Sequence, residues 1–148
     1  MHLFATEKVT KENVSTVYGA ISPTVYNEFL ETIDFQDPYH LTEIIADGPR
    51  EHGSKYGLLN LSRDSAVFDM AFGCGKMGEL LHAKGFTHIE GADATASYVR
   101  HVLEQGWYSE AYELYLGVPP IREDLQGRFD VVVGCGVFYE GHIPAAGF

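Results

Sequence analysis

A buried strand that runs directly into a glycine-rich turn is the feature that most constrains how this chain can fold. Residues 67–70 form an apolar strand that carries one acid, Asp69, and residues 73–78 follow with three glycines. Glycine lets a backbone approach a ligand where a Cβ atom would collide with it. A helix begins within the turn, and its free N–H groups point to the same place. The pattern indicates a binding site for a nucleotide-like or amino-acid-like ligand.

The chain around this turn alternates strands and helices in the manner of a parallel sheet. Helices are predicted at 76–84 and 95–105, each ended by a glycine, and strands at 87–92, 111–116 and 129–133. The last strand contains a continuous apolar run, which is typical of a strand covered on both faces. We therefore predict an α/β fold, a Rossmann-like three-layer sandwich with a mostly parallel sheet.

Two helices are predicted ahead of the sheet. Ser22-Pro23 provides an N-cap and a first helical residue, and Asp37-Pro38 repeats this arrangement. The second helix is predicted to end at Asp47-Gly48-Pro49. A chain of 148 residues suffices for one domain. Within it we distinguish an N-terminal helical segment with its connector, residues 1–64, from a cofactor-binding core, residues 65–148.

Charge and composition narrow the range of partners. The 21 acidic and 10 basic residues give a net charge of −11, which repels phosphate backbones and anionic lipids. We therefore expect a small-molecule or protein partner, no direct contact with nucleic acid and no membrane. The histidines show no metal-ligand spacing, so no metal is predicted. Two cysteines make no disulfide framework and the N-terminus carries no secretory pattern, so we expect a cytoplasmic protein.

Two further strand ends are predicted to meet the glycine turn. Asp93 closes the second strand 20 residues after Gly73. A carboxylate there can accept both hydroxyls of a ribose, because it offers two oxygens to two donors that are about as far apart. Gly134-Cys135-Gly136 follows the last strand, where small residues keep the floor of a cleft open. The carboxyl ends of parallel strands lie at one edge of a sheet, so three strand ends converge on one crevice.

These motifs resemble those of the class I S-adenosylmethionine-dependent methyltransferases. Asp69-x-Ala71-x-Gly73-x-Gly75 resembles the family's acid-x-Gly-x-Gly-x-Gly motif with alanine in the first glycine position, and Gly91-x-Asp93 resembles its ribose-binding acid. Within the class, residues 85–93 and 134–144 are similar to the Williams-Beuren-syndrome-region methyltransferase-like proteins. Ser22-Pro23-x-x-Tyr26-Asn27 weakly resembles the tyrosine-bearing helices that cover the cofactor in such enzymes.

The resemblance implies S-adenosylmethionine as the cofactor, S-adenosylhomocysteine as its product, and a role for each matching residue. The backbone of residues 71–75 would line the methionine part, Asp69 would order the turn or the amino group, and Asp93 would hold the ribose. Residues 134–136 would flank the methyl group. Because the cofactor already carries an activated methyl group, the protein mainly has to align the nucleophile and exclude water, and no catalytic base is named. The predicted cofactor-binding residues are Tyr26, Asp69, Ala71, Phe72, Gly73, Gly75, Asp93, Ala94, Gly134, Cys135 and Gly136.

Other interpretations stay open for several of these residues. The glycine turn alone also fits a dinucleotide fingerprint or a merely structural turn, although a carboxylate at Asp69 would crowd a pyrophosphate and suits an ammonium group. Asp93 can be a solvated acid at a strand end, and Asp69 a cap for backbone N–H groups. Tyr26 can serve helix packing, and His142 is either a contact in the cleft or a capping or surface residue.

The end of the sequence bears on activity and assembly. The resembling enzymes continue beyond their fourth strand with further strands and helices, whereas this sequence ends at Phe148. A strand at 131–133 that is left at the sheet edge exposes backbone pairing groups and apolar faces. We therefore expect a homodimer formed through this edge or through residues 137–148. The alternative is a monomer in which the N-terminal helices or the tail fold back over the edge. Two functions remain open, a methyltransferase and a methyltransferase-like cofactor-binding or interaction protein without turnover.

Overall fold

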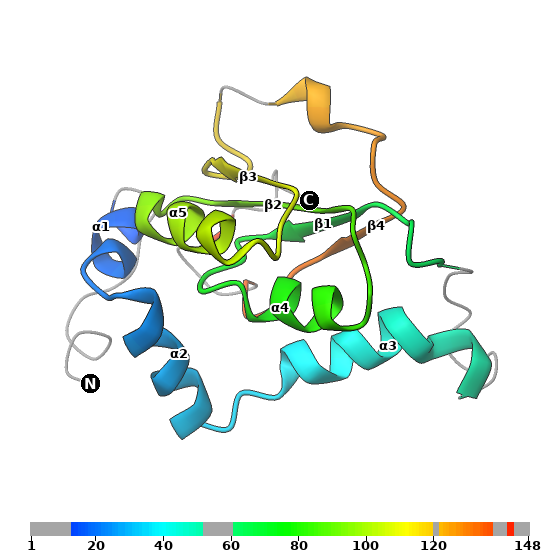
Figure 1. Cartoon of the computed structure of the whole chain (residues 1–148). Coiled ribbons are helices and arrows are strands. Elements are labelled where there is room, and N and C mark those ends of the chain that lie inside the picture. The colour runs from blue at the N-terminus through cyan, green and yellow to red at the C-terminus, as the bar shows by residue number, and fades with distance from the viewer. Residues whose placement is uncertain (1–12, 52–60, 120–121, 138–141, 144–148) are drawn as a thin grey trace.

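A four-stranded parallel sheet forms the centre of the molecule (Figure 1). The computed structural model describes residues 13–51, 61–119, 122–137 and 142–143. The strands are β1 (Val67–Met70), β2 (Ile89–Asp93), β3 (Glu110–Glu113) and β4 (Val131–Val133), in the order β3-β2-β1-β4. Every pair of neighbouring strands is parallel. The predicted α/β, Rossmann-like architecture is therefore confirmed.

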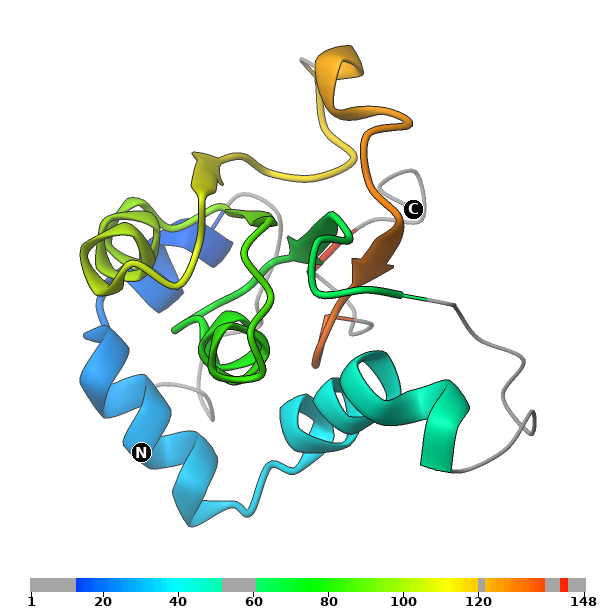
Figure 2. The ribbon, with the colours of Figure 1, turned by 45° about the vertical axis from the view of Figure 1, so that its right-hand side comes forward.

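Helices pack along one side of this sheet. They are α1 (Val14–Gly19), α2 (Pro23–Thr32), α3 (Asp37–Glu51), α4 (Lys76–Ala83) and α5 (Ala96–Gln105). In Figure 2, α5, α4 and α3 form an arc along that side, and α1 and α2 pack against α5. The serine predicted to cap α2 does so, because the Ser22 hydroxyl accepts the N–H of Val25 at 3.3 Å. No helix in the described part of the chain is long and apolar enough to cross a bilayer.

Helix α3 continues past the point at which the sequence predicts its end. We expected it to stop at Asp47-Gly48-Pro49, because proline offers no N–H to the carbonyl four residues earlier. The helix instead extends to Glu51. Two tertiary contacts support it: α3 packs along α4, and the Arg63 guanidinium donates to the carbonyl of Ala46 at 3.1 Å. Tertiary packing here overrides the local propensity.

Apolar side chains fill both faces of the sheet, but the two layers differ in thickness. The main core lies under the helices, where Val67 and Ile89 from the sheet meet Leu81 of α4 and Val102 of α5, all fully buried. On the other face a smaller cluster forms around Phe68, Met70 and Ala92. In the described part of the chain this second face is covered by the segment between β3 and β4, which contains only the short 3-10 helix η3 (Glu123–Leu125).

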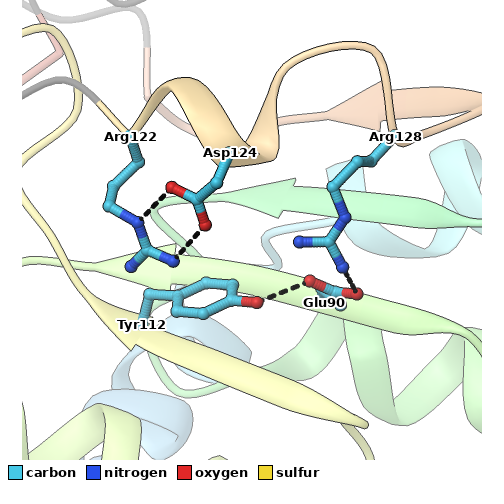
Figure 3. A network of polar contacts seen from close by, with 5 residues as sticks. All are labelled: Glu90, Tyr112, Arg122, Asp124 and Arg128. Atoms are coloured by element: carbon cyan, nitrogen blue, oxygen red, sulfur yellow. Dashed lines mark hydrogen bonds and ion pairs between the residues drawn. The ribbon is translucent and has the colours of Figure 1, made fainter.

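A polar network ties that covering segment to the sheet (Figure 3). Glu90 of β2 accepts the Tyr112 hydroxyl of β3 and the Arg128 guanidinium, each at 2.7 Å. Arg122 binds both oxygens of Asp124 at 2.7 Å and lies over the Tyr112 ring, 4.7 Å from its centroid. Each exposed ion pair contributes little stability by itself. Together they place the segment across β2 and β3.

Strand β4 lies at the sheet edge and pairs only with β1 among the described strands. The apolar run that ends in this strand predicted cover on both faces. The structure contradicts this, because Val132 is 54% exposed whereas Val133 is buried under the helical layer. Among the described residues, the segment that covers the second face of the sheet leaves the Val132 side of β4 exposed, and the helix-facing side is covered.

We propose that a second copy of the chain covers this exposed edge. An edge strand with an apolar outward side chain offers both hydrogen-bonding groups and surface to a partner. Dilution is then expected to lower the melting temperature, because association and folding are linked. Thermal unfolding over a hundredfold range of protein concentration tests this, with Val132→Lys as the variant that should remove the dependence. A concentration-independent melting temperature and a monomer in light scattering would contradict it.

Candidate ligand site at the carboxyl ends of the strands

A cavity of about 80 Å³ that opens to solvent lies where the carboxyl ends of β1, β2 and β4 meet. The three predicted strand ends therefore do converge. The predicted residues that line the cavity are Tyr26, Ala71, Gly73, Asp93, Ala94, Cys135 and Gly136. The lining residues outside that set are Val14, Tyr18, Thr95, Tyr98, Leu114, Tyr115, Leu116, Val137, His142 and Ile143.

Asp93 joins the end of β2 to the glycine turn. One carboxylate oxygen accepts the N–H of Gly73 at 2.9 Å, and the other accepts the N–H of Thr95 at 2.8 Å. The Thr95 hydroxyl also bonds it. With 8% of its surface exposed, Asp93 is not a solvated acid, and burial raises its pKa against the opposing effect of these hydrogen bonds. A carboxylate has about four acceptor positions, so roughly one remains for a ligand.

The turn after β1 is held in an unusual backbone conformation. Ala71 has a φ of 50°, in the left-handed region that non-glycine residues rarely adopt, and Gly73 has a φ of 57°. The Tyr26 ring lies over the turn. A Cβ atom added at Gly73 would be 3.2 Å from Cε1 of Tyr26. Backbone strain at a cavity persists only where the surroundings fix it. The contacts from Tyr26 and Asp93 provide that restraint.

Asp69 supports the turn from behind and does not line the cavity. Its side chain is 1% exposed, and it accepts the Tyr108 hydroxyl at 2.6 Å. That hydroxyl in turn accepts the N–H of Gly78 in α4 at 3.1 Å. Asp69 therefore links β1 to α4 through Tyr108, which no sequence motif marks.

Three other predicted contacts also lie outside the cavity lining. Phe72 turns its ring into the main core, where it packs on Tyr108 with the ring centroids 5.1 Å apart. Gly75 forms the N-cap of α4. Gly134 lies close to the side chains of Val137 and Met70. The rest of the cavity wall comes from residues on both sides of the turn in sequence, from Val14 and Tyr18 of α1 to His142 and Ile143.

The buried carboxylate makes a pH dependence testable. Burial raises the pKa of Asp69 to about 7, against the opposing effect of the Tyr108 hydrogen bond. Since this folded pKa exceeds the unfolded value of about 4, the contribution of Asp69 to stability is complete at low pH and is lost as pH rises through 7. Relative to Asp69→Asn, which keeps an oxygen for Tyr108, the wild type should lose about 2 kcal/mol between pH 5 and pH 7. Urea unfolding at both pH values measures this, and parallel profiles would contradict it.

Tyrosines and one histidine form the wall that the sequence analysis largely missed. Tyr18 shares a 2.8 Å hydrogen bond with His142 Nε2, and the Tyr115 hydroxyl donates to the His142 carbonyl at 2.5 Å. Tyr26 stacks on Tyr98 with ring centroids 5.7 Å apart, and Tyr18 meets Tyr26 edge-on at 5.6 Å. The sequence left two positions open for His142, in the cleft or at the surface. The structure places His142 in the cleft. Tyr18 lies on the unpredicted helix α1, so no local pattern identified it.

The cavity is aromatic and carries one carboxylate. None of the described lining residues is a lysine or an arginine. Burial, and secondarily the charge of Asp93, raise the pKa of Tyr18, which therefore stays protonated at neutral pH. Cys74 and Cys135 are free thiols. Among the described residues, no cluster of three His, Cys, Asp or Glu side chains is placed to hold a metal ion.

The chemistry of this wall suits a ligand with apolar surface, hydroxyl groups and a positive centre. Aromatic faces attract cations, and Asp93 offers its remaining acceptor position to a donor. No protein-family model matches the sequence, and no curated protein matches it.

Proposed function

We propose that this protein binds S-adenosylmethionine at the cavity and transfers its methyl group to a small-molecule or protein nucleophile. The observation that carries this proposal is the position of Asp93, buried at the carboxyl end of β2 and bonded to the N–H of Gly73 in the neighbouring turn. In parallel α/β sheets, ligands bind outside the carboxyl ends of the strands, and an acid there bonds a ribose hydroxyl.

The electrostatics favour a sulfonium over a dinucleotide. A pyrophosphate binds to free N–H groups at a helix N-terminus, which here is Gly75 at the start of α4. The cavity reaches Gly73 and Ala71 but is not lined by residues 75–77. It also contains the Asp93 carboxylate and no cationic side chain among its described lining residues, which disfavours two phosphates. A cationic sulfonium meets tyrosine faces and a carboxylate instead.

Each part of the site has a defined task in this proposal. When bound, S-adenosylmethionine supplies an activated methyl group that is displaced in line by the acceptor. Asp93 holds the ribose through its remaining acceptor position, and the strained backbone at Ala71 and Gly73 lies along the amino-acid part. The rings of Tyr18, Tyr26 and Tyr98 exclude water, which favours transfer to the acceptor over hydrolysis.

Titration calorimetry with S-adenosylmethionine, S-adenosylhomocysteine and NAD tests the proposal. We expect saturable 1:1 binding of the first two and none of NAD. Saturable NAD binding without any response to the sulfur compounds would overturn it. Release of S-adenosylhomocysteine in the presence of amine, thiol, hydroxyl or protein acceptors then tests turnover. Binding without release would indicate the alternative, a methyltransferase-like cofactor-binding protein.

A further inference from the structure

A buried hydroxyl at the cavity has no hydrogen-bond partner among the described residues. Tyr98 lines the cavity and is 1% exposed, yet its hydroxyl oxygen is bonded to nothing in the described part of the chain. Burying an unpaired hydroxyl costs free energy. Tyr108 shows the usual solution, because its equally buried hydroxyl both donates to Asp69 and accepts from Gly78. The unpaired state of Tyr98 therefore calls for an explanation.

The position of Tyr98 suggests which part of a ligand it meets. Tyr98 lies in the first turn of α5, immediately after the segment in which Asp93 accepts the N–H of Thr95. Its ring is fixed by stacking on Tyr26. Burial and then the nearby charge of Asp93 raise the pKa of the Tyr98 hydroxyl, so it keeps its proton at neutral pH and can act as a donor. A donor beside the ribose-binding acid faces the nucleoside half of a ligand.

We infer that the Tyr98 hydroxyl donates a hydrogen bond to an acceptor atom on the nucleoside half of bound S-adenosylmethionine, and so selects for the adenosine part of this ligand. The inference rests on the proposed function. It explains why an uncompensated hydroxyl is kept in a core position that phenylalanine would fill equally well. The stability lost in the free protein is recovered as affinity when the ligand supplies the missing partner.

The substitution Tyr98→Phe tests this inference through two effects of opposite sign. Without ligand, removal of the unpaired hydroxyl should raise the melting temperature by roughly 2–4 °C. Affinity for S-adenosylhomocysteine should fall about tenfold, and affinity for methylthioadenosine, which lacks the amino-acid part, should fall by the same factor. Ser97→Ala is the matched control, because the Ser97 hydroxyl is also buried without a described partner but does not line the cavity. It should stabilise the protein and leave both affinities unchanged.

Each outcome decides a specific point. If the wild type binds neither compound, the proposed function fails and the inference fails with it. If the wild type binds both and Tyr98→Phe binds them equally well, the inference is overturned while the proposed function stands. A loss confined to S-adenosylhomocysteine would place the contact on the amino-acid half and also overturn the inference. A lower melting temperature for ligand-free Tyr98→Phe would mean that the hydroxyl has a structural partner, and it would also overturn the inference.

Discussion

Gly78→Ala is expected to lower the free energy of unfolding by at least about 3 kcal/mol. A Cβ atom at this position in α4 would lie 2.1 Å to 2.5 Å from the ring and hydroxyl of Tyr108. That ring cannot move away cheaply, because its hydroxyl is the described partner of the buried Asp69 carboxylate. Displacing it adds an unpaired buried acid to the cost of the steric overlap. Urea unfolding monitored by circular dichroism measures the change.

Gly19→Ala is the matched control for this experiment. Gly19 is also a helical glycine, at the end of α1, but the nearest atom to an added Cβ is Thr95 Cγ2 at an ordinary 3.8 Å. Its free energy of unfolding should change by less than about 1 kcal/mol. If Gly78→Ala were equally harmless, Tyr108 would not be the fixed support of β1 and α4 that the structure shows.

Asp93→Ala is expected to impair binding and folding together. Under the proposed function, loss of the ribose contact assigned to Asp93 should weaken affinity for S-adenosylhomocysteine about 10-fold to 100-fold. The same change leaves the N–H groups of Gly73 and Thr95 without their acceptor, which should lower the free energy of unfolding by about 2–4 kcal/mol. Calorimetry at a temperature where the variant is folded separates the two effects.

Asp130→Ala provides the comparison at the opposite end of the sheet. Asp130 also accepts a backbone N–H, that of Ala66 ahead of β1, at 2.8 Å. Because this bond lies at the amino ends of β1 and β4, its loss should reduce stability without changing affinity. Equal losses of affinity in Asp93→Ala and Asp130→Ala would mean that binding reports stability alone, and would contradict the role given to Asp93.

Local signals in the sequence accounted for the central part of the fold. The strand, turn and helix from 67 to 83 were predicted because apolar pattern, glycines and helix start all occur within a few residues. The end of α3 was predicted wrongly, because the contact between Arg63 and the Ala46 carbonyl comes from a distant segment. The exposure of Val132 could not be predicted either. A run of apolar residues does not show whether both faces of a strand are covered by other elements.

The candidate site was predictable mainly along strand ends, and Tyr26 of α2 is the predicted lining residue that lies elsewhere. Asp93 and the turn at Gly73 follow from the position of a strand end, which is a local property. Asp69 was expected near the ligand, but side chains alternate along a strand, and it shares the helix-facing side with Val67. It therefore points into the core under α4, where it meets Tyr108. Tyr18 enters the cavity through tertiary packing alone.

The hydrogen bond between Tyr18 and His142 joins residues that are 124 positions apart. Closing so long a loop is entropically costly, and contacts of large sequence separation slow folding. We therefore expect the wall of the cavity that contains this pair to form late, after the local strand and helix units. A chain still emerging from the ribosome cannot contain the finished site until His142 has been synthesised. Acquisition of ligand affinity during refolding would then mark the final step of assembly rather than the formation of the sheet.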